Sequence, residues 1–166
     1  MIILSSKRTA DTIDAKLLQA LTADPRAAIG ALAEQIGVSR NTVRARLARW
    51  DDAGALESFE RTITPGFLGY PLRAFVLTSV KQLLLAEVAA ALQGIPEVVE
   101  VQGLSGMTDL LIQVVARDAD DLYRVAGQIL GIRGVKRTNT ALVMRDLMNF
   151  RLSPLVNRLL TGADSD

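Results

Sequence analysis

The chain has 166 residues, of which 49% are hydrophobic and 4% are aromatic, and its formal net charge is +1. This composition supplies enough apolar surface for one good-sized domain or two small ones, and it argues against intrinsic disorder. Because the chain contains no cysteine and no histidine, disulfides, thiolate zinc sites, cysteine nucleophiles and the usual Ser-His-Asp triad are excluded.

Three short helices are predicted in the first third of the chain. Asp11 is a suitable N-cap for the first helix, which ends before Pro25. The second helix runs over about 28–36, and Gly37 ends it in a left-handed cap. Ser39 caps the third helix, so the second and third helices are joined by a tight turn of the kind found in helix-turn-helix motifs.

The third helix, which stops near Gly54, carries four arginines and no acid between residues 39 and 50. Val43, Leu47 and Trp50 recur at helical spacing and predict its buried stripe, so the polar side chains off that stripe face outward. This pattern is typical of a recognition helix that enters the major groove of DNA. The candidate DNA-binding residues are Ser39, Arg40, Asn41, Thr42, Arg44, Arg46 and Arg49.

These candidates divide by the part of DNA that each side chain suits. Arg40, Asn41 and Arg44 are expected to contact base edges, because arginine can bind guanine and asparagine can bind adenine with two hydrogen bonds. Ser39 and Thr42 suit phosphate oxygens, which position a protein without specifying a sequence.

Arg46 has a second interpretation that carries equal weight. It lies next to the buried stripe, so it can be partly buried and paired with Asp14, Asp51 or Asp52 instead of DNA. For an isolated basic helix, a solvated charged face would be the more common interpretation, and the preceding helix and turn are what favour DNA binding here.

A small wing hairpin is predicted after the third helix, from the short runs Leu56–Phe59 and Arg61–Thr64. Proline and glycine residues then punctuate a linker. We therefore expect a DNA-binding domain over 1–63 and a linker over 64–71.

The second half of the chain predicts a different architecture, a ferredoxin-like α+β domain with the order strand, helix, strand, strand, helix, strand. Its expected elements are strand 73–80, helix 83–92, strands 98–104 and 109–116, helix 119–130 and strand 138–144. We expect this domain to span 72–161 and to be followed by a disordered tail at 162–166. The free face of such a sheet is often apolar and buried by a second copy.

A glycine-rich turn precedes Asp109, which stands at the start of an otherwise apolar strand. A carboxylate there can hold an ammonium group and the free backbone N–H groups of the turn can hold a carboxylate, which together describe a free amino acid. A plain hairpin turn with a local aspartate cap is the more common interpretation of this spacing. Thr138 and Thr140 on the last strand join the candidate effector site, the alternative being ordinary strand propensity.

Taken in order, these residues resemble the leucine-responsive and asparagine-responsive regulators of the Lrp/AsnC family, over about Asp11 to Met148. The motifs that carry the resemblance are Asp11 and Asp14; Leu32, Ala33, Gly37 and Ser39; Val43, Arg46, Leu47 and Trp50; Asp51, Gly54 and Leu56; Leu68 and Gly69; Gly106, Asp109 and Leu111; and Gly134, Val135, Thr138 and Thr140.

The resemblance implies a winged helix-turn-helix joined to a ferredoxin-like effector domain, called the RAM domain. It also implies dimers formed through the sheets, often assembled into octamers, with amino acids or related metabolites bound between RAM domains. Asp109 matches the position that typically engages the amino group of the effector, and Gly106, Met107 and Thr108 would line the same turn. Trp50 replaces the usual leucine, and Met107 and Thr108 replace acidic or aromatic residues, which changes the shape and polarity of the pocket.

The sequence therefore predicts a DNA-binding transcription regulator rather than an enzyme, with double-stranded DNA, a second copy of itself and an amino-acid-like effector as partners. The alternative is an architectural, nucleoid-organising protein that binds DNA without a ligand. No catalytic residues, metal site or cofactor are expected. No run reaches the roughly 18 apolar residues of a membrane helix and the start lacks a secretory signal, so a cytoplasmic, nucleoid-associated protein is expected.

Overall fold

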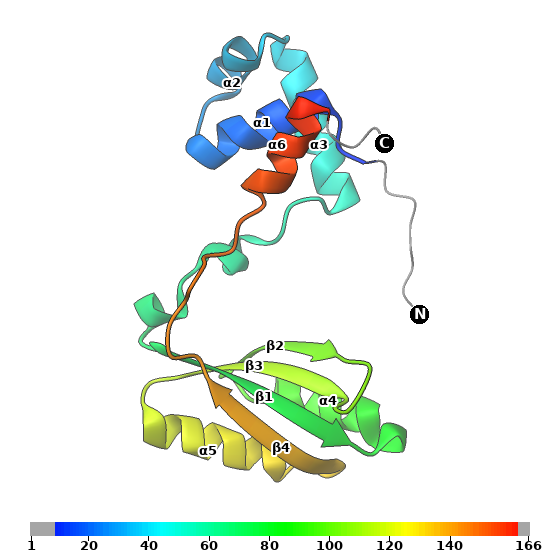
Figure 1. Ribbon diagram of the computed structural model, residues 1–166, viewed down its shortest axis with the longest axis vertical. Coiled ribbons are helices and arrows are strands. Elements are labelled where there is room, and N and C mark those ends of the chain that lie inside the picture. Colours follow the sequence, from blue (N-terminus) through cyan, green and yellow to red (C-terminus); the bar gives the residue numbers. More distant parts are fainter. Residues whose placement is uncertain (1–8, 163–166) are drawn as a thin grey trace. The chain divides into compact units, whose positions relative to one another are not determined.

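The computed structural model describes residues 9–162 and divides into two compact units (Figure 1). The helical unit comprises the residues up to Ser58 and those from Met148 onward. The sheet unit comprises Phe59–Leu147. The chain thus crosses from one unit to the other twice, and each unit has its own hydrophobic core.

The first three helices of the helical unit are α1 (Thr12–Ala23), α2 (Ile29–Ile36) and α3 (Arg40–Ala53). Their ends follow the predicted caps. Asp11 accepts hydrogen bonds from the backbone of the first turn of α1, and Gly37 closes α2 at a φ of 73°. The helix-turn-helix is therefore confirmed, with α2 and α3 joined through this left-handed glycine.

The core of the helical unit lies where the apolar faces of these helices meet. Its buried residues are Leu17, Ala20, Leu32, Ala33, Val43 and Trp50. Val43 and Trp50 belong to the predicted stripe of α3, and Leu47 packs against the same cluster. The stripe fixes which face of α3 turns toward solvent.

A fourth helix, α6 (Ser153–Thr161), also belongs to the helical unit and packs beside α1 (Figure 1). Placing 72–161 in one effector domain is therefore wrong at its C-terminal end. The physical reason is that Val156, Leu159 and Leu160 form a half-buried apolar stripe on α6. Such a stripe predicts an amphipathic helix but does not indicate which hydrophobic core the helix packs against. Gly162 closes α6, and the remainder of the predicted tail, 163–166, lies outside the described residues.

The predicted wing hairpin is wrong. Between Gly54 and Leu72 the structure places two 3-10 helices, η1 (Phe59–Thr62) and η2 (Pro65–Leu68), and no strand. Only Glu60 separates the two runs that suggested a hairpin, which is fewer than the two residues of the tightest hairpin loops. Residues 59–63 and the predicted linker, 64–71, fall in the sheet unit, where Arg61 pairs with Glu100 at 2.8 Å.

The sheet unit has the predicted order of elements around one antiparallel sheet with the strand order β2-β3-β1-β4. The elements are β1 (Leu72–Val80), the short helix η3 (Gln82–Leu84), α4 (Leu85–Gln93), β2 (Val98–Gly103), β3 (Leu110–Ala116), α5 (Ala119–Leu130) and β4 (Val135–Leu142). The last strand starts three residues before the predicted 138, directly after Gly134, which has a φ of 103°.

Helices α4 and α5 cover one face of this sheet, as Figure 1 shows. Alternate residues of β1, among them Val76 and Thr78, are fully buried beneath them. The alternation leaves Phe75 and Leu77 of β1 and Leu111 of β3 on the other face, where they are only half-buried. That face is therefore partly apolar.

Candidate nucleic-acid interface and effector turn

The outward side of α3 carries three of the predicted base-contacting residues. Arg40, Asn41 and Arg44 are all exposed. The Nη1 group of Arg44 donates a hydrogen bond to Oδ1 of Asn41 at 3.3 Å. An arginine and an asparagine that lie together on an exposed ridge can both reach base edges.

Ser39 and Thr42 form the start of the same helix. The Ser39 hydroxyl accepts a hydrogen bond from the Thr42 backbone N–H at 3.0 Å, and the two hydroxyls lie 2.8 Å apart. Ser39 thus acts as the N-cap, as predicted. A phosphate contact by either residue remains a prediction.

Arg46 and Arg49 face a different environment, because both are held by aspartates at the start of α1. Arg46 pairs with Asp11 and lies 3.0 Å from Oδ1 of Asp14. Arg49 donates to the other oxygen of Asp14. Of the acids considered for Arg46, Asp14 is the partner that the structure shows, and the pairing of Arg49 was not anticipated.

Asp14 is the centre of this arrangement. Its side chain is only 1% exposed, and it also accepts hydrogen bonds from the Trp50 indole at 3.2 Å and from the Asp11 backbone at 3.1 Å. Burial alone would raise the pKa of Asp14, but the hydrogen bonds from the Asp11 backbone and the two arginines outweigh it, so the pKa lies below its ordinary value. The Arg46 guanidinium likewise lowers the pKa of Asp11. Both carboxylates therefore stay charged and hold the arginines.

The predicted effector turn is tied to the end of β1 by Asp109. Its Oδ2 accepts a hydrogen bond from the Val80 backbone at 2.8 Å, and its Oδ1 accepts one from the Gln82 side chain at 2.7 Å. Its backbone N–H donates to the Thr78 carbonyl at 3.0 Å. The aspartate therefore links two strands, which is more than the local cap considered from the sequence.

The other residues of the candidate effector site are dispersed. Gly106 has a φ of 114° and Met107 is 92% exposed, while Thr108 is half-buried. Thr138 and Thr140 of β4 lie opposite Thr78 and Val76 of β1. They therefore belong to the face of the sheet that the helices cover. Because β1 lies between β3 and β4, one chain does not bring these threonines together with Asp109.

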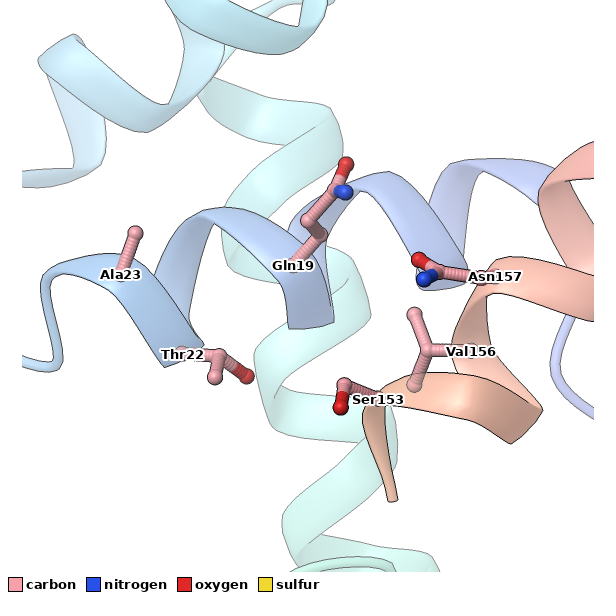
Figure 2. Close-up of a pocket in the computed structure, with 6 residues that line it drawn as sticks. All are labelled: Gln19, Thr22, Ala23, Ser153, Val156 and Asn157. Atoms are coloured by element: carbon pink, nitrogen blue, oxygen red, sulfur yellow. The ribbon is translucent and has the colours of Figure 1, made fainter. Parts of the chain in front are cut away.

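A pocket that the sequence did not indicate lies between α1 and α6 (Figure 2). Its lining residues are Gln19, Thr22, Ala23, Ser153, Val156 and Asn157. Predicting it would require knowing that α6 packs on α1, and the sequence carries no local signal for that contact. Within residues 9–162, no group of three or more acidic side chains is arranged to hold a metal ion, and no helix is long and apolar enough to cross a membrane.

Comparison with known proteins gives matches over both units. A family model described as the AsnC-type helix-turn-helix domain matches residues 11–49, and one described as the Lrp/AsnC ligand binding domain matches residues 73–152. The HTH-type transcriptional regulator FL11 of Pyrococcus horikoshii is 30% identical over 135 residues, which cover 81% of this chain and 89% of the relative.

Solved structures agree with these matches. The structure of E. coli AsnC has a TM-score of 0.78 at 28% identity and covers 88% of this chain and 99% of its own. A transcriptional regulator of Neisseria meningitidis, solved in complex with L-methionine, has a TM-score of 0.75 at 26% identity. The match covers 89% of this chain and 99% of the Neisseria chain.

Proposed function

The chain belongs to the Lrp/AsnC family of transcriptional regulators, and on this basis we propose that α3 binds double-stranded DNA sequence-specifically under the control of an amino-acid-like effector. Its relatives are regulators of transcription and not enzymes. The sheet unit is the family's ligand-binding domain. Action at the nucleoid, in the cytoplasm, is part of the proposal.

One observation carries the DNA-binding part of the proposal, namely the separation of the α3 arginines into two groups. Arg46 and Arg49 are engaged by Asp11 and Asp14, so their proposed role is structural. The exposed ridge, defined as Arg40, Asn41 and Arg44, keeps its polar groups on the side away from the core. The ridge residues are proposed to read bases, and Ser39 and Thr42 to contact phosphates.

The experiment for this part is selection of binding sites from a pool of random duplexes by the purified protein. An enriched sequence with two related half-sites, spaced by one or more helical turns, is expected if a two-fold dimer binds. Enrichment of no sequence, with affinity that depends only on salt concentration, would contradict sequence-specific binding.

A second copy of the chain is the proposed partner of the open sheet face. Phe75, Leu77 and Leu111 are half-buried there and lack a covering layer within the sheet unit, and such apolar faces mark protein interfaces. Dimers, and octamers built from them, are therefore proposed. Light scattering that gives the mass of a monomer at micromolar concentration would contradict this.

The proposed effector is an amino acid, and the bound L-methionine of the Neisseria relative makes methionine the first to test. Asp109 would hold its ammonium group, with Gly106, Met107 and Thr108 around it. Thr138 and Thr140 lie across the sheet from this turn in the same chain, so any role for them requires the partner's site.

A thermal-shift screen against the free amino acids, read with light scattering, tests the effector. A hit should raise the unfolding temperature, because a ligand that binds only the folded state stabilises it. Asp109→Asn should abolish the response by removing the charge. Gln82→Ala is the matched control, since it removes one hydrogen-bond partner of Asp109 and leaves its carboxylate in place.

The second candidate is a ligand-independent architectural DNA-binding protein. The observation that favours it is that both carboxylate oxygens of Asp109 already accept hydrogen bonds within the chain. No response to any amino acid, combined with weak sequence preference and strongly salt-dependent binding, would support this candidate over the first.

A further inference from the structure

The four arginines of α3 differ in what holds each guanidinium group. Aspartates hold Arg46 and Arg49, and the Asn41 side chain accepts a hydrogen bond from Arg44. The Arg40 guanidinium forms no hydrogen bond or ion pair with any residue between 9 and 162.

The Arg40 guanidinium lies near Gly30, in the first turn of α2. A Cβ atom at Gly30 would lie 3.4 Å from both Nε and Nη2 of Arg40 and 3.5 Å from its Cζ. The guanidinium therefore lies beside the space that a side chain at position 30 would occupy. At these distances a methyl group would only touch the guanidinium, whereas atoms beyond Cβ would occupy its place.

The presence of glycine here is not explained by the helix itself. Glycine is among the least favourable residues in a helix, and α2 has only 8 residues and no side-chain cap at Ala28. Gly30 also lacks a positive φ, so its backbone conformation does not require glycine. A residue with little or no side chain at this position leaves space for the Arg40 side chain.

We propose that Gly30 is a positioning residue for Arg40, and that it sets the base preference of the protein at one position of each half-site. This inference rests on the proposed function. Arg40 is the first residue of α3, and the N-terminal part of a recognition helix is the part that contacts base edges. Because Gly30 has no side chain, this placement of the guanidinium is open, whereas a long side chain at position 30 would exclude it.

The experiment compares Gly30→Ala, Gly30→Leu and Arg40→Ala on the duplex selected by the wild-type protein. Gln35→Leu is the matched control, because it places the same side chain at an exposed position of the same helix. Leucine and alanine both favour helix over glycine, so the unfolding temperatures of the Gly30 variants should be equal to or above that of the wild type. A loss of DNA affinity then does not arise from unfolding.

Gly30→Leu should weaken binding by roughly 5- to 100-fold, close to the loss in Arg40→Ala, which is the range for one good base contact. Gly30→Ala and Gln35→Leu should stay within about threefold of the wild type, the alanine because its Cβ only touches the guanidinium. In the Arg40→Ala background, Gly30→Leu should cause less than about twofold further loss, because the group it displaces is already gone. Repeating the selection with Gly30→Leu should show the loss of base preference at one position per half-site.

Three results would overturn the inference. They are unchanged affinity of Gly30→Leu, an equal loss in Gln35→Leu, and a full additional loss when Gly30→Leu is combined with Arg40→Ala. Failure of the wild-type protein to select any sequence would instead overturn the proposed function, so the two failures are distinguishable.

Discussion

At the scale of single residues, Asp14 links the fold of the helical unit to the orientation of α3. Asp14 is buried and lies in the first turn of α1. Its carboxylate binds Arg46, Arg49 and Trp50 in the second half of α3. The contacts with Arg49 and Trp50 join residues that are 35 and 36 positions apart in the sequence. The outward direction of the exposed ridge therefore depends on a buried carboxylate on the opposite side of the helix.

Asp14→Asn should lower the free energy of unfolding by about 2 to 3 kcal/mol, because it removes the buried partner of two arginines. Urea denaturation of the variant measures the loss. Asp52→Asn removes an exposed acid from α3 and should change the same quantity by less than about 0.5 kcal/mol. Equal effects of the two substitutions would show that the Asp14 network does not stabilise the unit.

Acid should destabilise the protein through the same carboxylates. The folded pKa values of Asp11 and Asp14 lie below their ordinary value of 3.8, so the unfolded chain binds more protons as the pH falls. Their contribution is complete above about pH 5 and is lost as the pH falls through the lowered values. Denaturation midpoints between about pH 6 and 2 should fall for the wild type and fall less steeply for Asp14→Asn. Parallel curves would contradict the assignment.

At the scale of elements, Gly134 shows where a turn depends on glycine. Its φ is 103°, and a Cβ there would lie 2.9 Å from the Cβ of Leu84 and 3.1 Å from Val88. Gly134→Ala should lower the free energy of unfolding by more than about 1 kcal/mol, because alanine would add backbone strain and this clash. Gly127→Ala is the control, since it lies in α5 with open space around it, and it should stabilise by about 0.5 to 1 kcal/mol. Thermal unfolding should show a lower unfolding temperature for Gly134→Ala and a higher one for Gly127→Ala. A shift in the same direction for both variants would contradict the special role of Gly134.

Helix α6 is the element whose role was least evident from the sequence. Because it packs on α1, Leu160→Ala should lower the stability of the helical unit by about 1 kcal/mol, as expected for a half-buried leucine. Leu155 is 57% exposed on the same helix, and Leu155→Ala should have little effect. Hydrogen exchange of the α1 amides reports on this unit directly, and unchanged protection in Leu160→Ala would show that α6 does not support α1.

At the scale of the whole molecule, the sequence predicted the helices and strands whose ends and faces depend on neighbouring residues in the chain. Asp11, Gly37 and Ser39 are caps whose effect is confined to one helix end, and the helices they bound were predicted closely. The strand expected at 73–80 is β1, whose residues alternate between buried and half-buried positions over most of its length. The order of elements in the sheet unit then followed from counting strands and helices.

Contacts between segments that are distant in the sequence could not be predicted from the sequence. The pairing of Arg49 with Asp14 and the packing of α6 on α1 each join segments that sequence spacing does not relate. Arg49 shares its residue type with Arg40 and Arg44 of the exposed ridge, so composition alone did not distinguish an arginine paired with a buried acid from an exposed one. The predicted wing failed for a different reason, since its two runs were too close together for a hairpin loop.

The two units of the chain are joined by two crossings, so the proposed ligand of the sheet unit and the proposed DNA of the helical unit would act on one molecule. An effector can change DNA binding only through a difference in its affinity for two states of the protein. The size of that difference is measurable as the ratio of DNA affinities with and without the amino acid.

The most direct test of the account is a titration of the selected duplex and a scrambled duplex with the wild type, Arg44→Ala and Arg26→Ala. Arg26 is exposed and lies outside α3, so it controls for the loss of one positive charge. Arg44→Ala should weaken binding to the selected duplex by about 1 to 3 kcal/mol and affect the scrambled duplex much less, while Arg26→Ala should change both slightly and equally. Equal losses on both duplexes for Arg44→Ala, or no loss on either, would contradict base reading by the exposed ridge.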